Sequence, residues 1–258
     1  HQAAVLALAA PDDGSFLVSG GADHEVRLWS SGGDRALAHA DAAVQAVAAS
    51  ADGAVVLWAA GDEVGVRWLD ADRQATLRVD GGVTAAALGR DGRRAAVGAR
   101  DGRLLLLRLD RAGAIGSEVH GDAGAAVRAI AFSPDGRRLA WAGDDGGVRV
   151  LTVGGAELAL AGHRDLVRAL AFAPEGERLA SAGDDGQVRL WDVATGEGRS
   201  LARPGWVADV TFSPDGRTVA SIGADGDVHL ERDELPRDPT ALRARIAELA
   251  VQLAPEAR

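Results

Sequence analysis

A repeat of about 40 residues, carried by two separate markers, constrains the fold of this 258-residue chain more than any other feature. An acidic residue followed by glycine recurs six times, at intervals of 39, 39, 44, 40 and 40 residues, and a second series of aspartates keeps the same intervals. Two markers that stay in step over six units indicate six copies of one structural unit. The first series comprises Asp13-Gly14, Asp52-Gly53, Asp91-Gly92, Asp135-Gly136, Glu175-Gly176 and Asp215-Gly216, and the second comprises Asp23, Asp62, Asp101, Asp145, Asp185 and Asp225.

The units share the pattern of four short strands, most clearly in the fifth, although the sixth lacks the outer strand. Apolar residues alternate through Val167, Ala169 and Ala171, which predicts a strand. A Pro-Glu-Gly turn follows, then a second strand over 178–182, a Gly/Asp-rich turn, a third strand over 187–192 and a weaker fourth strand over 198–202. Third strands are expected in the other units at 25–30, 65–70, 103–108, 147–152 and 227–232.

A four-stranded unit of this size cannot bury both faces by itself, so the units must cover one another. Radial stacking around an axis achieves this, which predicts an all-β propeller of four-stranded antiparallel blades. Six repeats are visible, and the ring has either six blades or seven with one blade missing. We expect a propeller domain over 1–232 and a separate tail over 233–258, with repeats at about 1–40, 41–79, 80–122, 123–162, 163–202 and 203–232.

The fifth unit carries the Gly-His and Trp-Asp dipeptides that mark one repeat class. Its sequence over 162–192, GHRDLVRALAFAPEGERLASAGDDGQVRLWD, resembles the WD-repeat β-propeller family. The weaker units depart from the pattern at the position of Trp191, where the third, fourth and sixth have Leu107, Leu151 and Glu231. In the second unit either Trp68 or Leu69 takes that position, and one extra residue near Gly65 would explain the ambiguity.

The resemblance implies a buried hydrogen-bond tetrad of His, Ser, Asp and Trp in two units. The alternative interpretation of the same Ser, His and Asp is a hydrolase triad. The tetrad is favoured, because a triad also needs an oxyanion hole and a substrate cleft. The tetrads are His163, Ser181, Asp185 and Trp191 in the fifth unit, and His1, Ser19, Asp23 and Trp29 in the first.

A loop-lined face of the ring is the candidate partner-binding surface. The residues beside the first strand and before the turn aspartate vary between units and cluster on one face in this fold. Trp and Arg are enriched among interface anchors, although a plugging role for Trp206 and solvated arginines are the simpler alternatives. The candidates are Trp206, Arg168, Arg128, Arg100, Asp184 and Asp144.

Composition excludes several functions. The chain has 28 Lys plus Arg against 38 Asp plus Glu, a net charge of −10; binding nucleic acid or an anionic membrane needs a cationic face, so we expect neither. The longest apolar runs fall well short of the roughly 20 residues that span a bilayer. No Cys and no Lys are present, which excludes disulfides, thiolate sites and a Walker-type phosphate loop.

We expect no metal and no cofactor. The six histidines contain no pair at i, i+4, which opposes a zinc site. Calcium needs six to eight converging oxygens, whereas the aspartates recur at the repeat period, where turns require them.

The tail predicts an amphipathic helix over 239–254. Asp238 and Pro239 are typical of a helix start, and four apolar residues follow at helical spacing: Leu242, Ile246, Leu249 and Leu253. Docking on the propeller is the favoured role for this helix, and self-association or partner binding is the alternative.

The pattern as a whole favours a non-catalytic scaffold or sensor that binds a protein or peptide. The absence of Lys, Asn, Met and Tyr indicates a GC-rich, bacterial genome. We expect a cytoplasmic regulatory or signalling protein with an effector domain before His1. The alternatives are a propeller hydrolase or lactonase with its site at the channel mouth, and a structural ring in an oligomer assembled through the 239–254 helix.

Overall fold

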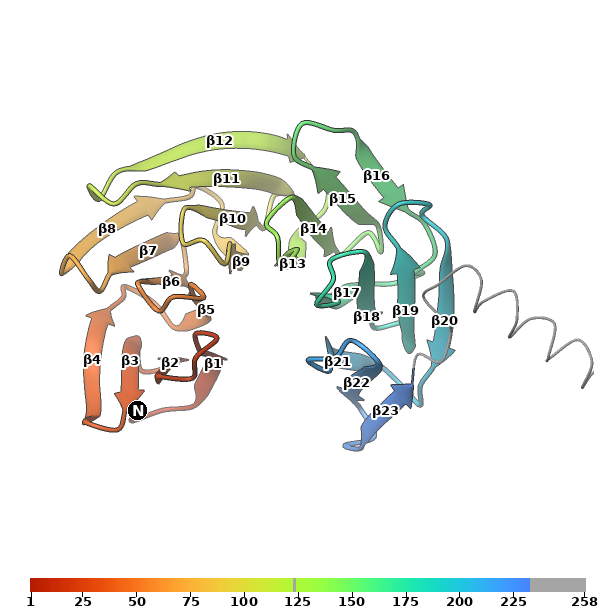
Figure 1. Ribbon diagram of the computed structural model, residues 1–258, viewed down its shortest axis with the longest axis horizontal. Coiled ribbons are helices and arrows are strands. Elements are labelled where there is room, and N and C mark those ends of the chain that lie inside the picture. The colour runs from red at the N-terminus through yellow and green to blue at the C-terminus, as the bar shows by residue number, and fades with distance from the viewer. Residues whose placement is uncertain (123, 233–258) are drawn as a thin grey trace, which may run out of the picture.

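Six small antiparallel sheets make up the computed structural model of the chain, which describes residues 1–122 and 124–232 (Figure 1). In each sheet the strands lie side by side in chain order, and the described residues contain no helix. Five sheets have four strands and the last has three. We call the sheets blades 1 to 6 in chain order. The prediction of an all-β fold built from repeated blades is confirmed, while the expected helix over 239–254 lies outside the described residues.

The strands begin and end as follows. Blade 1 has β1 (Val5–Ala9), β2 (Phe16–Gly21), β3 (Glu25–Ser30) and β4 (Gly33–His39); blade 2 has β5 (Val44–Ala49), β6 (Val55–Ala60), β7 (Glu63–Trp68) and β8 (Arg73–Arg78); blade 3 has β9 (Val83–Leu88), β10 (Arg94–Ala99), β11 (Arg103–Leu109) and β12 (Ile115–Asp122). Blade 4 has β13 (Val127–Phe132), β14 (Arg138–Gly143), β15 (Val148–Thr152) and β16 (Glu157–Leu160); blade 5 has β17 (Val167–Phe172), β18 (Arg178–Gly183), β19 (Gln187–Asp192) and β20 (Gly198–Ala202); blade 6 has β21 (Val207–Phe212), β22 (Thr218–Gly223) and β23 (Val228–Arg232).

The blades are arranged as an arc around a central axis. Figure 1 shows the first strand of every blade on the inner side and the last strand on the outer side. The inner strand of each blade contacts that of the next blade, from β1 and β5 through to β17 and β21. Blades 1 and 6 stand at the two ends of the arc with a gap between them (Figure 1). The arrangement is that of a propeller, and the choice between six and seven blades stays a prediction.

The turn between the first and second strands is fixed locally by its sequence. In blade 4 the Ser133 hydroxyl accepts a hydrogen bond from the N–H of Arg138 at 2.8 Å, and Asp135 accepts one from the N–H of Arg137 at 3.0 Å. Gly136 has a φ of +65°, the left-handed conformation that glycine adopts without steric cost. The acidic-Gly marker of the repeat is therefore a turn requirement, as the spacing predicts.

The core lies between blades and consists mostly of small aliphatic side chains. Between blades 4 and 5, larger residues of one blade such as Leu179 and Trp191 pack against smaller ones of its neighbour such as Ala140 and Val148. Each of blades 2 to 5 buries its two faces against different neighbours, as the repeat argument requires.

The two end faces of the arc carry interface residues without a neighbouring blade. Val228 and Leu230 of blade 6 are 66% and 69% exposed, whereas their repeat equivalents Val188 and Leu190 in blade 5 are 0% and 7% exposed. On blade 1, exposed Leu17 likewise corresponds to buried Leu179. The same side-chain pattern is core in the middle of the arc and surface at its ends.

Blade 2 corrects one prediction. The third strand is β7 over Glu63–Trp68, not 65–70, and there is no extra residue near Gly65. Ala60 of β6 pairs with Glu63 of β7, so two residues form the turn between these strands. In blade 5 Ala182 pairs with Val188, and the corresponding turn is one residue longer. The shorter turn shifts β7 so that Arg67, rather than Trp68 or Leu69, occupies the rung of Trp191.

Candidate functional site

The predicted tetrad residues of blade 5 lie together in a continuous hydrogen-bonded chain. Trp191 Nε1 donates to Ser181 Oγ at 2.8 Å, and Ser181 Oγ lies 2.7 Å from His163 Nε2. His163 Nδ1 lies 3.0 Å from the carboxylate of Asp185. The side chain of His163 is fully buried and that of Asp185 is 8% exposed. The loop, the second strand and the third strand of one blade are thereby connected by four side chains.

The direction of these bonds follows from what each group can donate. An indole N–H only donates, so the Ser181 oxygen accepts and its own proton goes to His163 Nε2. His163 Nδ1–H then donates a hydrogen bond to Asp185. The imidazole carries only this one proton and is neutral. Burial lowers the pKa of His163 and outweighs the neighbouring Asp185 carboxylate, which raises it. The network is satisfied only while His163 stays uncharged.

Asp185 is held as a carboxylate by the backbone as well as by the imidazole. Burial raises its pKa, but the N–H groups of Arg164 and Gln187 and the His163 side chain lower the pKa of Asp185 on balance. These two N–H groups donate to it at 3.1 Å and 3.0 Å. Asp185 therefore fixes the loop before β17 to the turn before β19.

Blade 1 repeats the arrangement with a more open indole. His1 Nδ1 lies 2.8 Å from Asp23, His1 Nε2 lies 2.6 Å from Ser19 Oγ, and Trp29 Nε1 donates to the same oxygen at 2.7 Å. Ser19 is 1% exposed, whereas Trp29 is 38% exposed because no blade covers that face.

The burial of both networks favours their structural interpretation over a hydrolase triad. The Ser181 oxygen already accepts a hydrogen bond from Trp191, and both Ser181 and its histidine are closed to solvent. A nucleophile must reach its substrate. We therefore assign no catalytic role to these serines.

Blades 2 and 4 build the same layer with an indole on a different strand. The second-strand position held by Ser181 in blade 5 is Trp58 in blade 2 and Trp141 in blade 4, and both indoles are buried. Trp58 lies directly over Gly65, where a Cβ would come within 2.0 Å of its ring. In blade 4 the Trp141 and His120 rings are perpendicular, with their centroids 5.8 Å apart. Sequence comparison of the third-strand position alone misses this exchange.

Blade 6 replaces the tetrad with charged groups. Arg203 Nε donates to Ser221 Oγ at 3.2 Å, and its guanidinium lies 3.9 Å from Glu231, which stands at the Trp191 position. The turn aspartate, Asp225, bonds instead to His229 at 2.6 Å.

The candidate partner-binding face is centred on a cation–π stack. The guanidinium of Arg168 lies 5.3 Å from the centroid of the Trp206 ring, and Trp206 is 46% exposed. Asp184 accepts two hydrogen bonds from the same guanidinium, one of them 2.9 Å long, and these bonds raise the pKa of Arg168. Residues from two blades thus form a fixed, exposed, amphipathic surface.

The neighbouring blade repeats the ion pair without the indole. Arg128 donates to both carboxylate oxygens of Asp144 at 2.6 Å and 3.0 Å, a bidentate geometry. Arg128 lowers the pKa of Asp144, and that bond raises the pKa of Arg128. The structure therefore brings five of the six predicted face residues into two equivalent pairs and one stack.

Arg100 completes the set with a different character. It occupies the repeat position of Asp184 and is exposed, with no side-chain bond to another residue in the described part of the chain. The position of its paired arginine is Thr84, whose hydroxyl donates to backbone carbonyl oxygens of Gly98 and Val127. The stack of Arg168 on Trp206 could be expected only once the two adjacent loops were known to meet.

One group of His and carboxylate side chains among the described residues is close enough to hold a metal ion. It consists of His1, Asp23 and Glu25, whose ligand atoms lie within 4.8 Å of one another. Both His1 ring nitrogens are already hydrogen-bonded, and Glu25 accepts a hydrogen bond from Arg27 at 2.6 Å.

The described part of the chain also contains no helix with the length and hydropathy needed to cross a bilayer.

These observations define a class: a β-propeller of repeated blades, two of which are braced by His-Ser-Asp-Trp networks. A family model for the WD40 repeat (WD domain, G-beta repeat) matches residues 1–30, 116–151, 156–192 and 198–230, together just over half of the chain. The chain belongs to the WD40 repeat family. The unmatched stretch includes blade 2, with its shifted third strand and relocated indole. No curated protein matches the sequence.

Proposed function

We propose that this chain is a non-catalytic interaction module that binds a protein or peptide on the face formed by Trp206, Arg168, Asp184, Arg128 and Asp144. WD40 repeats generally mediate protein–protein interactions. The observation that carries the proposal is the exposed Trp206 ring stacked at 5.3 Å on a guanidinium that Asp184 holds in place. Trp and Arg dominate binding hot spots, and a side chain fixed before binding loses less entropy on complex formation.

The ion pairs beside the stack add selectivity. The pair of Arg128 and Asp144 in blade 4 presents both charges at the surface, while Arg100 in adjacent blade 3 presents a cation without a partner among the described residues. A partner with an apolar group over Trp206 and a carboxylate near Arg100 matches this order of groups. Charged groups of this kind contribute mainly to partner choice and association rate.

We extend the proposal to the setting of the module. It is the scaffold or sensor part of a larger cytoplasmic, bacterial regulatory protein, with the propeller over 1–232, a linker and helix over 233–258, and the effector chemistry elsewhere in the parent chain. The net charge of −10 supports a protein partner over nucleic acid or an anionic membrane. The bias toward residues with GC-rich codons supports a bacterial source.

A capture experiment with matched variants tests the face. The wild-type chain is immobilised beside Trp206→Ala plus Arg168→Ala, and the captured protein is identified, purified and titrated back. We expect the double variant to raise Kd at least about thirtyfold, the effect of losing one hot spot of about 2 kcal/mol. Arg217→Ala, at an exposed arginine on the turn between β21 and β22, is the control and should leave Kd unchanged. Equal affinity of the double variant and the wild type would disprove this placement.

A further inference from the structure

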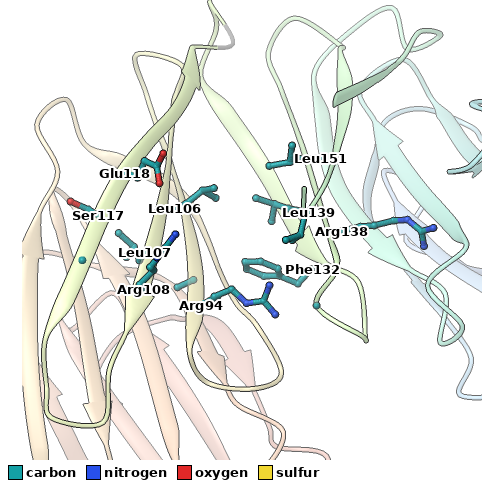
Figure 2. A pocket seen from close by; sticks show the side chains of 14 residues that line it. Arg94, Leu106, Leu107, Arg108, Ser117, Glu118, Phe132, Arg138, Leu139 and Leu151 are labelled. Carbon is teal, nitrogen blue, oxygen red and sulfur yellow. The ribbon is translucent and has the colours of Figure 1, made fainter. Parts of the chain in front are cut away.

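The seam between blades 3 and 4 contains a pocket of about 310 Å³. Its walls come from β10, β11 and β12 on one side and from β13, β14 and β15 on the other (Figure 2). Leu106, Phe132, Leu139 and Leu151 are among its apolar lining residues, and Arg94, Arg108, Arg138 and Glu118 are its charged ones. Arg108 and Glu118 are exposed, whereas Arg138 directs its guanidinium away from the pocket toward blade 5 (Figure 2).

The pocket exists because blade 4 lacks an indole on its third strand. Leu151 pairs with Leu139 on the same rung on which Trp191 pairs with Leu179 in blade 5. Trp191 is 3% exposed and closes the seam between blades 4 and 5. The relocated indole of Trp141 packs with Ala96 and Leu104 and does not line the pocket.

A second residue shows the same loss of cover. Val153 lines the pocket and is 64% exposed, whereas its equivalent Val193 is 7% exposed and belongs to the core. The seam between blades 3 and 4 is therefore short of one aromatic side chain, and the space left is apolar and open to solvent.

The charged residues of the lining are three arginines and one glutamate. Arg94 is bonded to Asp91 at 3.1 Å, and Arg138 donates to the carbonyl oxygen of Gly176 at 2.7 Å. Arg108 is exposed, and its side chain makes no hydrogen bond or ion pair to another described residue. Glu118 is the one acidic residue of the lining. It lies on β12 opposite Leu106 of β11, which is two residues before Arg108 on the same strand. Of these three arginines, Arg108 is the one whose side chain has no partner among the described residues, so it is the cation open to a carboxylate of a ligand.

We propose that this seam pocket binds an aromatic side chain from a linear segment of a partner protein, with an adjacent carboxylate held by Arg108. The aromatic ring takes the space that an indole fills between blades 4 and 5. The peptide backbone stays outside, over exposed Val153, which favours a peptide over a small molecule enclosed in the cavity. The site is separate from the Trp206 face, because Phe132 ends the inner strand β13, whereas Arg168 and Trp206 lie at the starts of the inner strands β17 and β21.

The test uses an acetylated peptide with one phenylalanine between two aspartates, in a glycine–serine background, titrated calorimetrically against the full chain. Leu151→Trp fills the pocket, and Arg108→Glu reverses the charge at its rim. We expect each variant to weaken binding at least about tenfold. Arg217→Glu, an equal charge change elsewhere, should have no effect, and the same peptide with alanine in place of phenylalanine should not bind.

The outcomes separate this pocket from its alternatives. Absence of wild-type binding, or equal binding by wild type and Arg108→Glu, overturns the proposal. Thermal melts verify that each variant is folded. Because Arg108 is exposed, Arg108→Glu still tests the proposal if Leu151→Trp does not fold. Binding of 3-phenylpropionate as tight as that of the peptide also overturns it, in favour of a free aryl acid. Trp206→Ala should bind the peptide normally, so failure of either site leaves the other testable.

Discussion

Blades 4 and 5 are adjacent, share their strand order and pair their first three strands in the same register, yet they fill their interfaces with an indole from different strands. In blade 5 the indole is Trp191 on the third strand, and its N–H is satisfied by Ser181. In blade 4 the indole is Trp141 on the second strand, and it contacts His120 edge-on.

The difference separates two contributions that the family pattern combines. Apolar volume in the interface comes from either strand, because the space between two blades is filled from both. The polar network requires the particular order of Trp, Ser, His and Asp, because each group must find a donor or acceptor. An indole on the second strand still adds aromatic volume to the interface, but it does not form the polar network. The third-strand position that it does not fill is where the seam pocket lies.

The largest expected effect comes from removing either indole. Trp191→Ala and Trp141→Ala should each lower the free energy of unfolding by about 3–5 kcal/mol, because both delete a buried aromatic side chain. Urea denaturation followed by circular dichroism measures this. A near-silent Trp141→Ala beside a costly Trp191→Ala would show that the two blades are not equivalent in packing.

A smaller effect isolates the polar network of blade 5. Ser181→Ala should cost about 1–3 kcal/mol, since it leaves the buried Trp191 N–H and His163 Nε2 without their partner. Ser200→Ala on outer strand β20 is the control and should be nearly silent. If Ser181→Ala unfolded at the wild-type urea concentration and instead abolished a hydrolytic rate, the triad interpretation would replace the tetrad.

The smallest effect is a pH dependence carried by His163. Burial lowers the pKa of His163 in the folded state, so below about pH 6.5 the unfolded chain binds a proton that the folded chain does not. This contribution to stability is complete above that pH and is lost as the pH falls toward the folded pKa. Urea midpoints at pH 7.5 and 5.5 should therefore differ more for wild type than for His163→Gln; identical differences would show that the histidine does not titrate in this way.

The fold could be predicted from the repeat because its markers are local. Pro-Asp-Gly and Gly-Asp turns fix where each hairpin reverses, and the alternation of Val167, Ala169 and Ala171 fixes which side of the strand is apolar. The same pattern shows that blades must cover one another. The register of blade 2 could not be predicted from the sequence, because one residue fewer in a hairpin changes the register without altering the composition of its strands.

By itself, the sequence determined the number of repeated units and their strand order, and its resemblance to the WD-repeat family implied the four residue types of each buried network. Tertiary structure alone decided which side chains from different blades meet: Arg168 under Trp206, and Leu151 facing an unfilled seam. The physical reason is that turns and alternation act over a few residues, whereas stacking and cavity formation depend on the volumes that two separate blades bring to one shared space.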